Sequence, residues 1–185
     1  SHFPPLLEGF GKAHPEVEIR VVAASTDQLR RLLQSKQVDL ALVSTLDLDA
    51  GEEVITTEAL VWVGAEPSLE AGRFAEPLPL ALTASNTLDH RAACDAMARA
   101  GLRYRIAYAS NSHAGLVAVT RSGLAVSVMT EKSVPPDLHV LGDPLPALPR
   151  LGIRVAYAET GRSSAARAFG DHIAEILALE AGAGG

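Results

Sequence analysis

The sequence is poor in cysteine, in aromatic residues and in long apolar runs. Cys94 is the one cysteine among 185 residues, so an internal disulfide is excluded, and a single thiol fits a reducing cytoplasm. No apolar run approaches the roughly 20 residues that a membrane-spanning helix needs, and no signal-peptide pattern is visible. Aromatic residues make up 4% of the chain, so the core must consist mainly of Leu, Val, Ile and Ala. We therefore expect a cytoplasmic globular protein.

The net charge and the absence of known motifs argue against further classes of function. The formal net charge is −6, and a surface of this sign repels nucleic-acid phosphates, which Lys and Arg normally neutralise. No Walker, GxGxxG or GxSxG string is present, and no nucleophile–base set stands out, so we expect no enzyme. The six histidines lack the i, i+4 pairing of a metal-binding helix. We therefore expect neither a metal nor a cofactor.

Alternating helix and strand patterns organise the N-terminal part. Apolar residues at i, i+3, i+4 and i+7 over 3–10 predict a helix, and alternating Val and Glu predict a strand over 17–23. Ser25 followed by Gln28 is a capping box, which predicts the start of a second helix. Residues 38–43 form a short apolar run, typical of a strand in a sheet covered on both faces. Together these patterns predict a parallel α/β layer.

The rest of the chain repeats the alternation. Two extended pieces, 54–57 and 60–63, predict a crossing into a second lobe, and the proline-dense stretch 135–149 predicts an irregular return. The strands that the pattern predicts are 78–83, 104–109, 124–129 and 151–157. The predicted helices are 89–100 and 113–122, each stopped by a glycine, and a closing helix over 165–179.

These elements predict an α/β fold of two Rossmann-like lobes joined by two hinge crossings. Lobe I is expected to comprise residues 1–58 and 150–185, and lobe II residues 59–149. A cleft between two lobes is a preferred place for a small ligand. The expected function is therefore binding of a small molecule.

Three stretches of the chain resemble the LysR-type bacterial transcription regulators. Residues 5–17, PLLEGFGKAHPEV, are similar to the family pattern PxLLxxFxxxHPxV. Residues 32–42, LLQSKQVDLAL, are similar to LxxGxxDLAL, with Ser35 or Lys36 where the family often has Gly. Residues 115–129, GLVAVTRSGLAVSVM, resemble VAAGLGVALLP. The three occur in the family's order across the whole chain, which makes the resemblance fairly specific.

The resemblance implies a type II periplasmic-binding-protein-like fold with an effector site at the hinge and assembly into dimers or tetramers. DNA would be bound through a winged helix-turn-helix N-terminal to this chain, and effector binding would alter the oligomer geometry that controls transcription. The resemblance also implies a strand before the first helix, but only Ser1 and His2 precede Phe3. The alternative is a solute-binding protein of a transport system, and an upstream helix-turn-helix or signal peptide would decide between the two.

Small hydroxyl and amide residues at the predicted strand-to-helix junctions are the candidate effector-binding residues. Helix N-termini attract anions, and the loops at the carboxyl ends of parallel strands collect at one edge. The same residues are favoured helix caps without any ligand, so that interpretation stays open for each. We predict hydrogen bonds to a small anionic organic effector, with Thr26, Ser85 and Asn111 as preferred contacts. The full set is Ser25, Thr26, Ser44, Ser85, Asn86, Asn111, Ser112 and Thr130.

Two further predictions concern Cys94 and the dimer surface. Cys94 stands among small apolar residues of a predicted helix, which favours a buried core residue over a redox sensor. Leu29, Val117 and Val119 have no obvious second layer to cover them, so their helices are candidates for a dimer surface. The alternative is that both helices pack on the sheets of their own lobes.

Overall fold

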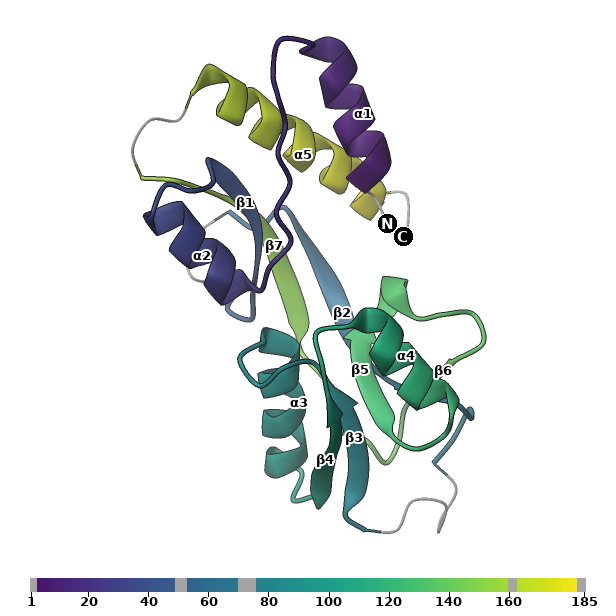
Figure 1. Cartoon of the computed structure of the whole chain (residues 1–185). Coiled ribbons are helices and arrows are strands. Elements are labelled where there is room, and N and C mark those ends of the chain that lie inside the picture. Colours follow the sequence, from purple (N-terminus) through teal and green to yellow (C-terminus); the bar gives the residue numbers. More distant parts are fainter. Residues whose placement is uncertain (1–2, 49–52, 70–75, 160–162, 183–185) are drawn as a thin grey trace. The chain divides into compact units, whose positions relative to one another are not determined.

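The computed structural model describes residues 3–48, 53–69, 76–159 and 163–182 (Figure 1). The chain divides into two compact units: unit 1 comprises residues 1–57 and 152–185, and unit 2 comprises residues 58–151. The chain leaves unit 1 along strand β2 (Thr56–Gly64) and returns along strand β7 (Arg150–Tyr157). None of the described helices is long and apolar enough to cross a membrane.

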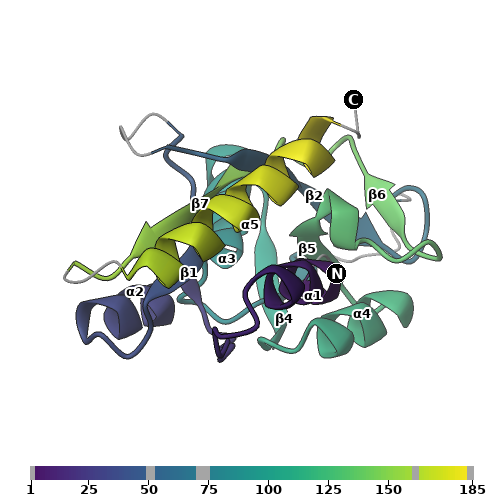
Figure 2. The ribbon, with the colours of Figure 1, turned by 90° about the horizontal axis from the view of Figure 1, so that it is seen from above.

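In its described part, unit 1 combines one end of the sheet with three helices. Strand β1 (Leu40–Thr45) pairs antiparallel with β7, from Leu40 opposite Tyr157 to Thr45 opposite Gly152. Helix α2 (Thr26–Gln34) packs on β1, where Leu33, Ala41 and Val43 form a small buried cluster. Helices α1 (Phe3–Ala13) and α5 (Ser164–Gly182) pack against each other (Figure 2).

Phe10 anchors the helix pair of unit 1. Its side chain is 1% exposed, and its ring lies 4.6 Å from the ring of Phe169 between centroids. The His14 ring also stacks on the Phe10 ring, with 4.4 Å between the ring centroids. The helix predicted from the apolar spacing of residues 3–10 is thus confirmed, and this spacing turns Leu6 and Phe10 towards α5.

The strand predicted over 17–23 is wrong. This segment has no regular secondary structure, and Val21 and Val22 are 55% and 44% exposed. Alternation predicts a strand only where another strand lies alongside to pair with it, and β1 forms the end of the described sheet. The predicted parallel layer is also wrong for this part of the chain, because the partner of β1 is the antiparallel β7.

Unit 2 is built around a mixed sheet with the strand order β4-β3-β5-β2-β6. Strand β3 is parallel to both β4 and β5, whereas β2 is antiparallel to β5 and β6. The carboxyl ends of β3, β4 and β5 therefore lie at one edge. In chain order the elements after β2 are β3 (Leu78–Leu82), α3 (Leu88–Arg99), β4 (Tyr104–Ala109), α4 (His113–Arg121), β5 (Val126–Thr130), the 3-10 turn η1 (Glu131–Ser133) and β6 (His139–Leu141).

The core of unit 2 surrounds β3. Leu80, Ala81 and Leu82 are at most 1% exposed. Trp62 of β2 is also buried, and its indole Nε1 donates a hydrogen bond of 2.7 Å to the carbonyl oxygen of Pro146. This bond holds the proline-dense return segment against β2. The buried side chains are mainly aliphatic, as the composition predicts.

Most element predictions for unit 2 are confirmed, and the differences have local causes. The two extended pieces predicted over 54–57 and 60–63 merge into one strand, β2, which begins at Thr56 and continues through residues 58 and 59. The stretch predicted as irregular contains β6, which pairs with β2. Gly101 (φ +67°) and Gly123 (φ +71°) follow α3 and α4 in the left-handed region, as expected for glycines that end helices.

The predictions for Cys94 and the dimer surface need correction. Cys94 is half-buried and is not a core residue. It lies at the edge of the buried face of α3, to which Ala93 and Met97 belong. Val117 is buried in the cluster beneath α4, and Val119 packs against the same cluster. Leu29 packs against the cluster beneath α2. These side chains cover their own sheets, so they give no reason to assign a dimer surface to α2 or α4.

Candidate functional site

Two loops of unit 2 meet at the carboxyl ends of its parallel strands. We call residues 83–87 the β3–α3 loop and residues 110–112 the β4–α4 loop. Asn111 Oδ1 accepts a hydrogen bond of 3.2 Å from the backbone N–H of Ala84, and Ser110 N–H donates to the Leu82 carbonyl at 3.1 Å. Because β3 and β4 are parallel neighbours, their following loops must lie side by side. The amide of Asn111 therefore joins the two loops directly.

The candidate residues of these loops differ in how they are used. Ser112 caps α4, because its Oγ accepts the N–H of Gly115 at 3.2 Å. Ser85 and Asn86 are exposed at the tip of the β3–α3 loop. The structure thus brings Ser85, Asn86, Asn111 and Ser112 to adjacent loops, and it assigns a capping role to Ser112.

A network in the β3–α3 loop was not predicted from the sequence. Thr87 caps α3 by accepting the N–H of His90 at 3.4 Å, and its own hydroxyl donates to the Ala84 carbonyl at 2.8 Å. The hydroxyl of Thr83 lies 2.6 Å from that of Thr87. The only hydrogen of Thr87 is already donated, so Thr83 is the donor of this pair. The threonine three residues before His90 was the available signal for the cap.

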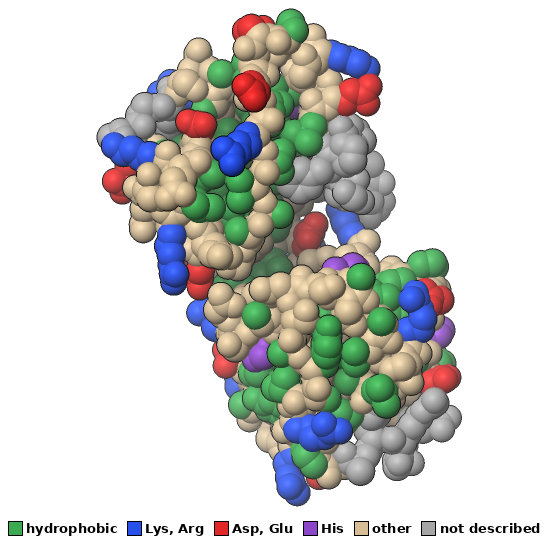
Figure 3. All heavy atoms as spheres, viewed as in Figure 1, with side chains coloured by type: hydrophobic (Ala, Val, Ile, Leu, Met, Phe, Trp, Pro, Cys, Tyr) green, Lys and Arg blue, Asp and Glu red, His purple; other side chains and the backbone are tan. Residues whose placement is uncertain are grey.

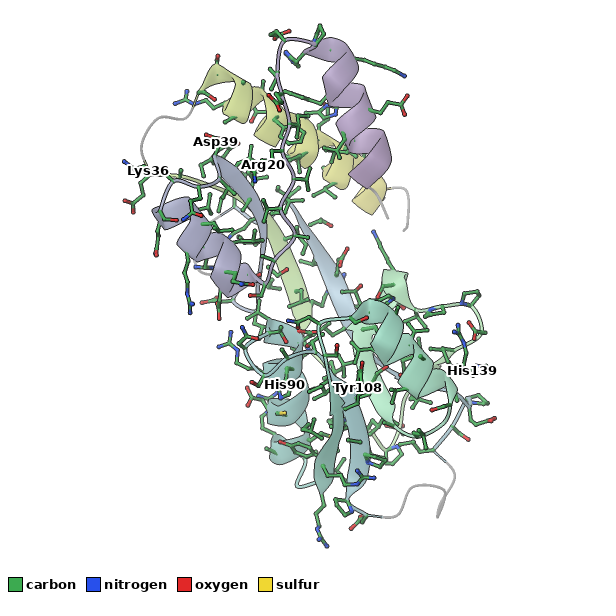
Figure 4. All side chains as sticks on the ribbon, viewed as in Figure 1. Arg20, Lys36, Asp39, His90, Tyr108 and His139 are labelled. Carbon is green, nitrogen blue, oxygen red and sulfur yellow. The ribbon has the colours of Figure 1, made fainter. Side chains whose placement is uncertain are left out.

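His90 is fixed on this edge by the backbone. Its Nδ1 lies 2.7 Å from the carbonyl oxygen of Thr83. A carbonyl only accepts, so Nδ1 carries the hydrogen and Nε2 keeps its lone pair in the neutral ring. Figure 4 labels His90 on the first turn of α3. The sequence indicated only a charged helix start there.

Thr130 ends β5 at the same edge. Its Oγ1 donates to Ser133 Oγ at 3.0 Å, and Ser133 Oγ donates to the Thr130 carbonyl at 2.8 Å. These two bonds stabilise the turn η1. Thr130 is therefore placed on the edge that the candidate set requires, although its hydroxyl hydrogen is used within the turn.

The remaining candidates form a group in unit 1. Ser25 caps α2 by accepting the N–H of Gln28 at 3.4 Å. Thr26 Oγ1 accepts the N–H of Ser44 at 3.2 Å, so the first turn of α2 is tied to the end of β1. The structure therefore brings Ser25, Thr26 and Ser44 together, and the predicted capping box is confirmed on its serine side.

Two of the ionisable side chains with shifted pKa values are Arg154 and Tyr104, which lie outside these loops. Arg154 of β7 is 8% exposed, and burial, reinforced by the charge of Arg30, lowers its pKa. In unit 2 a hydrogen bond with Cys94 raises the pKa of Tyr104, with burial and the charge of Asp95 acting in the same direction. Within the described ranges, no three His, Cys, Asp or Glu side chains are grouped closely enough to hold a metal ion.

The arrangement suits binding by hydrogen bonds. The first turns of α3 and α4 present backbone N–H groups and the positive ends of two helix dipoles, and hydroxyl and amide side chains surround them. Such a surface favours carboxylates and phosphates. On the face shown in Figure 3, acidic and basic side chains are interspersed, with no large patch of one charge. Binding of an anion on this face would therefore depend on the individual polar groups that contact it.

Comparison with known proteins gives consistent results. Residues 1–178 match the family model described as LysR substrate binding domain. The HTH-type transcriptional regulator DgdR of Burkholderia cepacia is 47% identical over 178 residues, which cover 95% of this chain and 60% of DgdR. This chain therefore spans about three-fifths of the length of that relative.

Solved structures show the same fold at low identity. The regulatory domain of CcmR from Synechocystis PCC6803, in complex with 2-PG, has a TM-score of 0.72 and 17% identity, over 94% of this chain and 90% of that one. The effector binding domain of QuiR in complex with shikimate also has a TM-score of 0.72 and 17% identity, over 94% and 88% of the two chains. Both matches span both units of this chain.

Proposed function

Because the chain belongs to the LysR substrate-binding domain family, we propose that it is the effector-sensing part of a longer, cytoplasmic transcription regulator. Its fold is the α/β, type II periplasmic-binding-protein-like fold of effector-binding domains in that family. The family consists of regulators, and the name of DgdR favours this function over a solute-binding protein of a transporter. The ligand we propose is a small organic anion.

The Asn111–Ala84 hydrogen bond is the observation that carries this proposal. It joins two loops whose helices both direct their N-termini at the same edge of unit 2. An anion at that edge would gain hydrogen bonds and two favourable helix dipoles. The solved CcmR and QuiR domains are in complex with small molecules, 2-PG and shikimate respectively.

The remaining parts of the proposal concern the longer protein. We propose that Ser25, Thr26 and Ser44 of unit 1 contribute to the same effector site. DNA would be bound by a segment outside this chain, since the net charge of −6 disfavours contact with phosphates. Effector binding would change the geometry of a dimer or tetramer, and it can do so only through different affinities for the two states.

The test is a thermal-shift screen with shikimate, benzoate and a panel of amino acids and hydroxy acids. A ligand that binds only the native state raises the melting temperature with concentration, by the equivalent of about 2.7 kcal/mol at a hundred times Kd. Asn111→Asp is the decisive variant. It keeps the oxygen that accepts from Ala84 but adds a negative charge, so an anionic ligand should no longer raise the melting temperature.

Two further variants complete the test. Ser122→Ala removes a hydroxyl at the other end of α4, where it bonds the Val119 carbonyl, and should leave the ligand response unchanged. Thr26→Ala should weaken the response through unit 1. A ligand response that is the same in Asn111→Asp and in the unchanged protein would refute the placement of the site.

A further inference from the structure

The side chain of Tyr108 in β4 lies on the opposite face of the sheet from the one that it would occupy in a regular strand. Residues 104, 106 and 108 of a regular strand share one face. Tyr104 is opposite Leu78 and Ile106 is opposite Leu80, but Tyr108 is opposite Ala81, because the register shifts between Leu80 and Ala81. One extra residue in β4, Ala107, therefore turns Tyr108 to the other face.

The turned side chain meets α4 instead of α3. Tyr104, before the bulge, faces α3, where Cys94 raises its pKa. Tyr108, after the bulge, packs against the buried cluster that includes Leu116 of α4 (Figure 4). Bulges that re-aim a side chain occur next to functional sites, and this one directly precedes the β4–α4 loop.

Glycine at position 115 is what allows the Tyr108 hydroxyl to come so close. A Cβ at Gly115 would overlap that hydroxyl and would lie 3.3 Å from Tyr108 Cζ and 3.5 Å from Ser112 Cβ. Gly115 is in the first turn of α4, and its N–H is the one that Ser112 caps. The lack of a Cβ at position 115 therefore lets the Tyr108 hydroxyl pack directly against the first turn of α4.

We propose that Tyr108 and Gly115 are positioning residues of the effector site. Their contact sets the distance between the first turn of α4 and β4. This distance in turn sets the positions of Asn111 and Ser112 at the edge where the anion is expected. The part of this inference that concerns a ligand rests on the proposed function. The part that concerns the loop geometry, reported by the Asn111–Ala84 hydrogen bond, is independent of it.

The experiment compares Gly115→Ala, Tyr108→Phe and the double variant. Gly11→Ala is the matched control, because it also adds a methyl group within a helix but meets nothing within 4 Å. The readouts are the amide chemical shift and hydrogen-exchange rate of Ala84. Gly115→Ala should displace the loop and speed this exchange about fivefold, the effect of losing one neutral hydrogen bond.

Tyr108→Phe should restore the Gly115→Ala variant, because the overlapping hydroxyl is gone and the next atom, Cζ, is 3.3 Å away. A change that affected only stability would move the melting temperature but leave the Ala84 shift in place. Equal Ala84 shifts in Gly115→Ala and Gly11→Ala, or no restoration in the double variant, would overturn the inference.

A titration with the ligand identified by the screen separates the two proposals. Loss of affinity in Gly115→Ala with recovery in the double variant supports both. An unchanged affinity despite a displaced loop would overturn the role of the contact in the effector site. If no compound binds the unchanged protein while the Ala84 readouts respond as expected, the proposed ligand class fails and the positioning contact stands.

Discussion

The two units differ in how much β-sheet contributes to their cores. Unit 2 surrounds a central strand, β3, with parallel neighbours on both sides, and its core residues Leu80, Ala81 and Leu82 are almost fully buried. Unit 1 contains one end of the sheet, where β7 lies between β1 and β2 in the strand order, with α2 packed on β1 and with α1 and α5 packed on each other. Small sheets need packing against helices for stability. Unit 1 therefore depends more on its helices.

The residues that follow the helices also favour unit 2 over unit 1. In unit 2, α3 and α4 are followed by Gly101 and Gly123, which enter the left-handed region without strain. In unit 1, α2 is followed by Lys36, which enters the same region at φ +57°. A side chain with a Cβ is disfavoured there. The comparison indicates that unit 2 combines better sheet packing with less backbone strain.

The largest expected effect tests whether the units unfold separately. Leu80→Ala should lower the free energy of unfolding by about 3 kcal/mol, because it leaves a cavity beside a central strand. The measurement is urea denaturation followed by the fluorescence of Trp62, which is in unit 2. Phe10→Ala is the counterpart in unit 1, and it should leave the Trp62 transition in place. Equal shifts in both variants would mean that the units unfold as one.

A smaller effect is expected from the buried hydroxyl pair of unit 2. Thr120 Oγ1 donates to the Leu116 carbonyl at 2.8 Å and lies 2.9 Å from Ser127 Oγ, and both side chains are fully buried. Thr120→Val leaves the serine hydroxyl without this partner and should cost about 2 kcal/mol. Adding Ser127→Ala should recover part of the loss. An additive loss in the double variant would show that the two hydroxyls do not interact.

Exchanging the helix-ending residues should reduce the difference between the units. Lys36→Gly should relieve the left-handed strain after α2 and stabilise unit 1 by up to about 1 kcal/mol. Gly101→Ala, which meets nothing within 4 Å, should destabilise unit 2 by about the same amount. Melting temperatures measure both changes. A stabilising Gly101→Ala would show that the positive φ carries no cost there.

The smallest effect is a pH dependence in unit 2. Arg121 and Asp137 form a two-bond ion pair between α4 and the segment that connects η1 to β6, with one bond of 2.9 Å. The hydrogen bond from Arg121 lowers the pKa of Asp137 from its ordinary value of 3.8. The pair therefore stabilises the fold above pH 3.8, and this contribution is lost as the pH falls through the lowered pKa.

Asp137→Asn should remove this component of the acid transition and change little at neutral pH, since both side chains are about half exposed. Melting temperatures between neutral pH and pH 2 measure it. An acid transition of the same size in Asp137→Asn would assign the loss to other carboxyl groups.

The sequence predicted helices and the strands of unit 2 well because those signals are local. The Ser25 cap and the glycine after α3 each act within one turn, so they can be recognised without tertiary information. The 17–23 segment shows the limit. Its alternation of Val and charged residues is that of a strand, but pairing depends on a neighbouring strand that the pattern does not contain.

The candidate site was predictable to the same degree. Strand-end residues such as Asn111 and Ser85 could be found because parallel strands place them at one edge. The Thr83–Thr87–His90 network and the turned Tyr108 were not found. The network depends on side-chain orientations, and the orientation of Tyr108 depends on a one-residue bulge, which no periodicity reveals.

Two of the outer strands of the described sheet, β4 and β1, bear on storage and concentration of the protein. Strand β4 carries the charged, exposed Arg105 and a bulge, both of which discourage another chain from adding to its edge. Strand β1, LALVST, has no charged residue and keeps an unbroken register with β7. Aggregation of this protein should therefore begin at β1, and a lysine placed at Leu42 would be the first substitution for keeping the isolated domain monodisperse at high concentration.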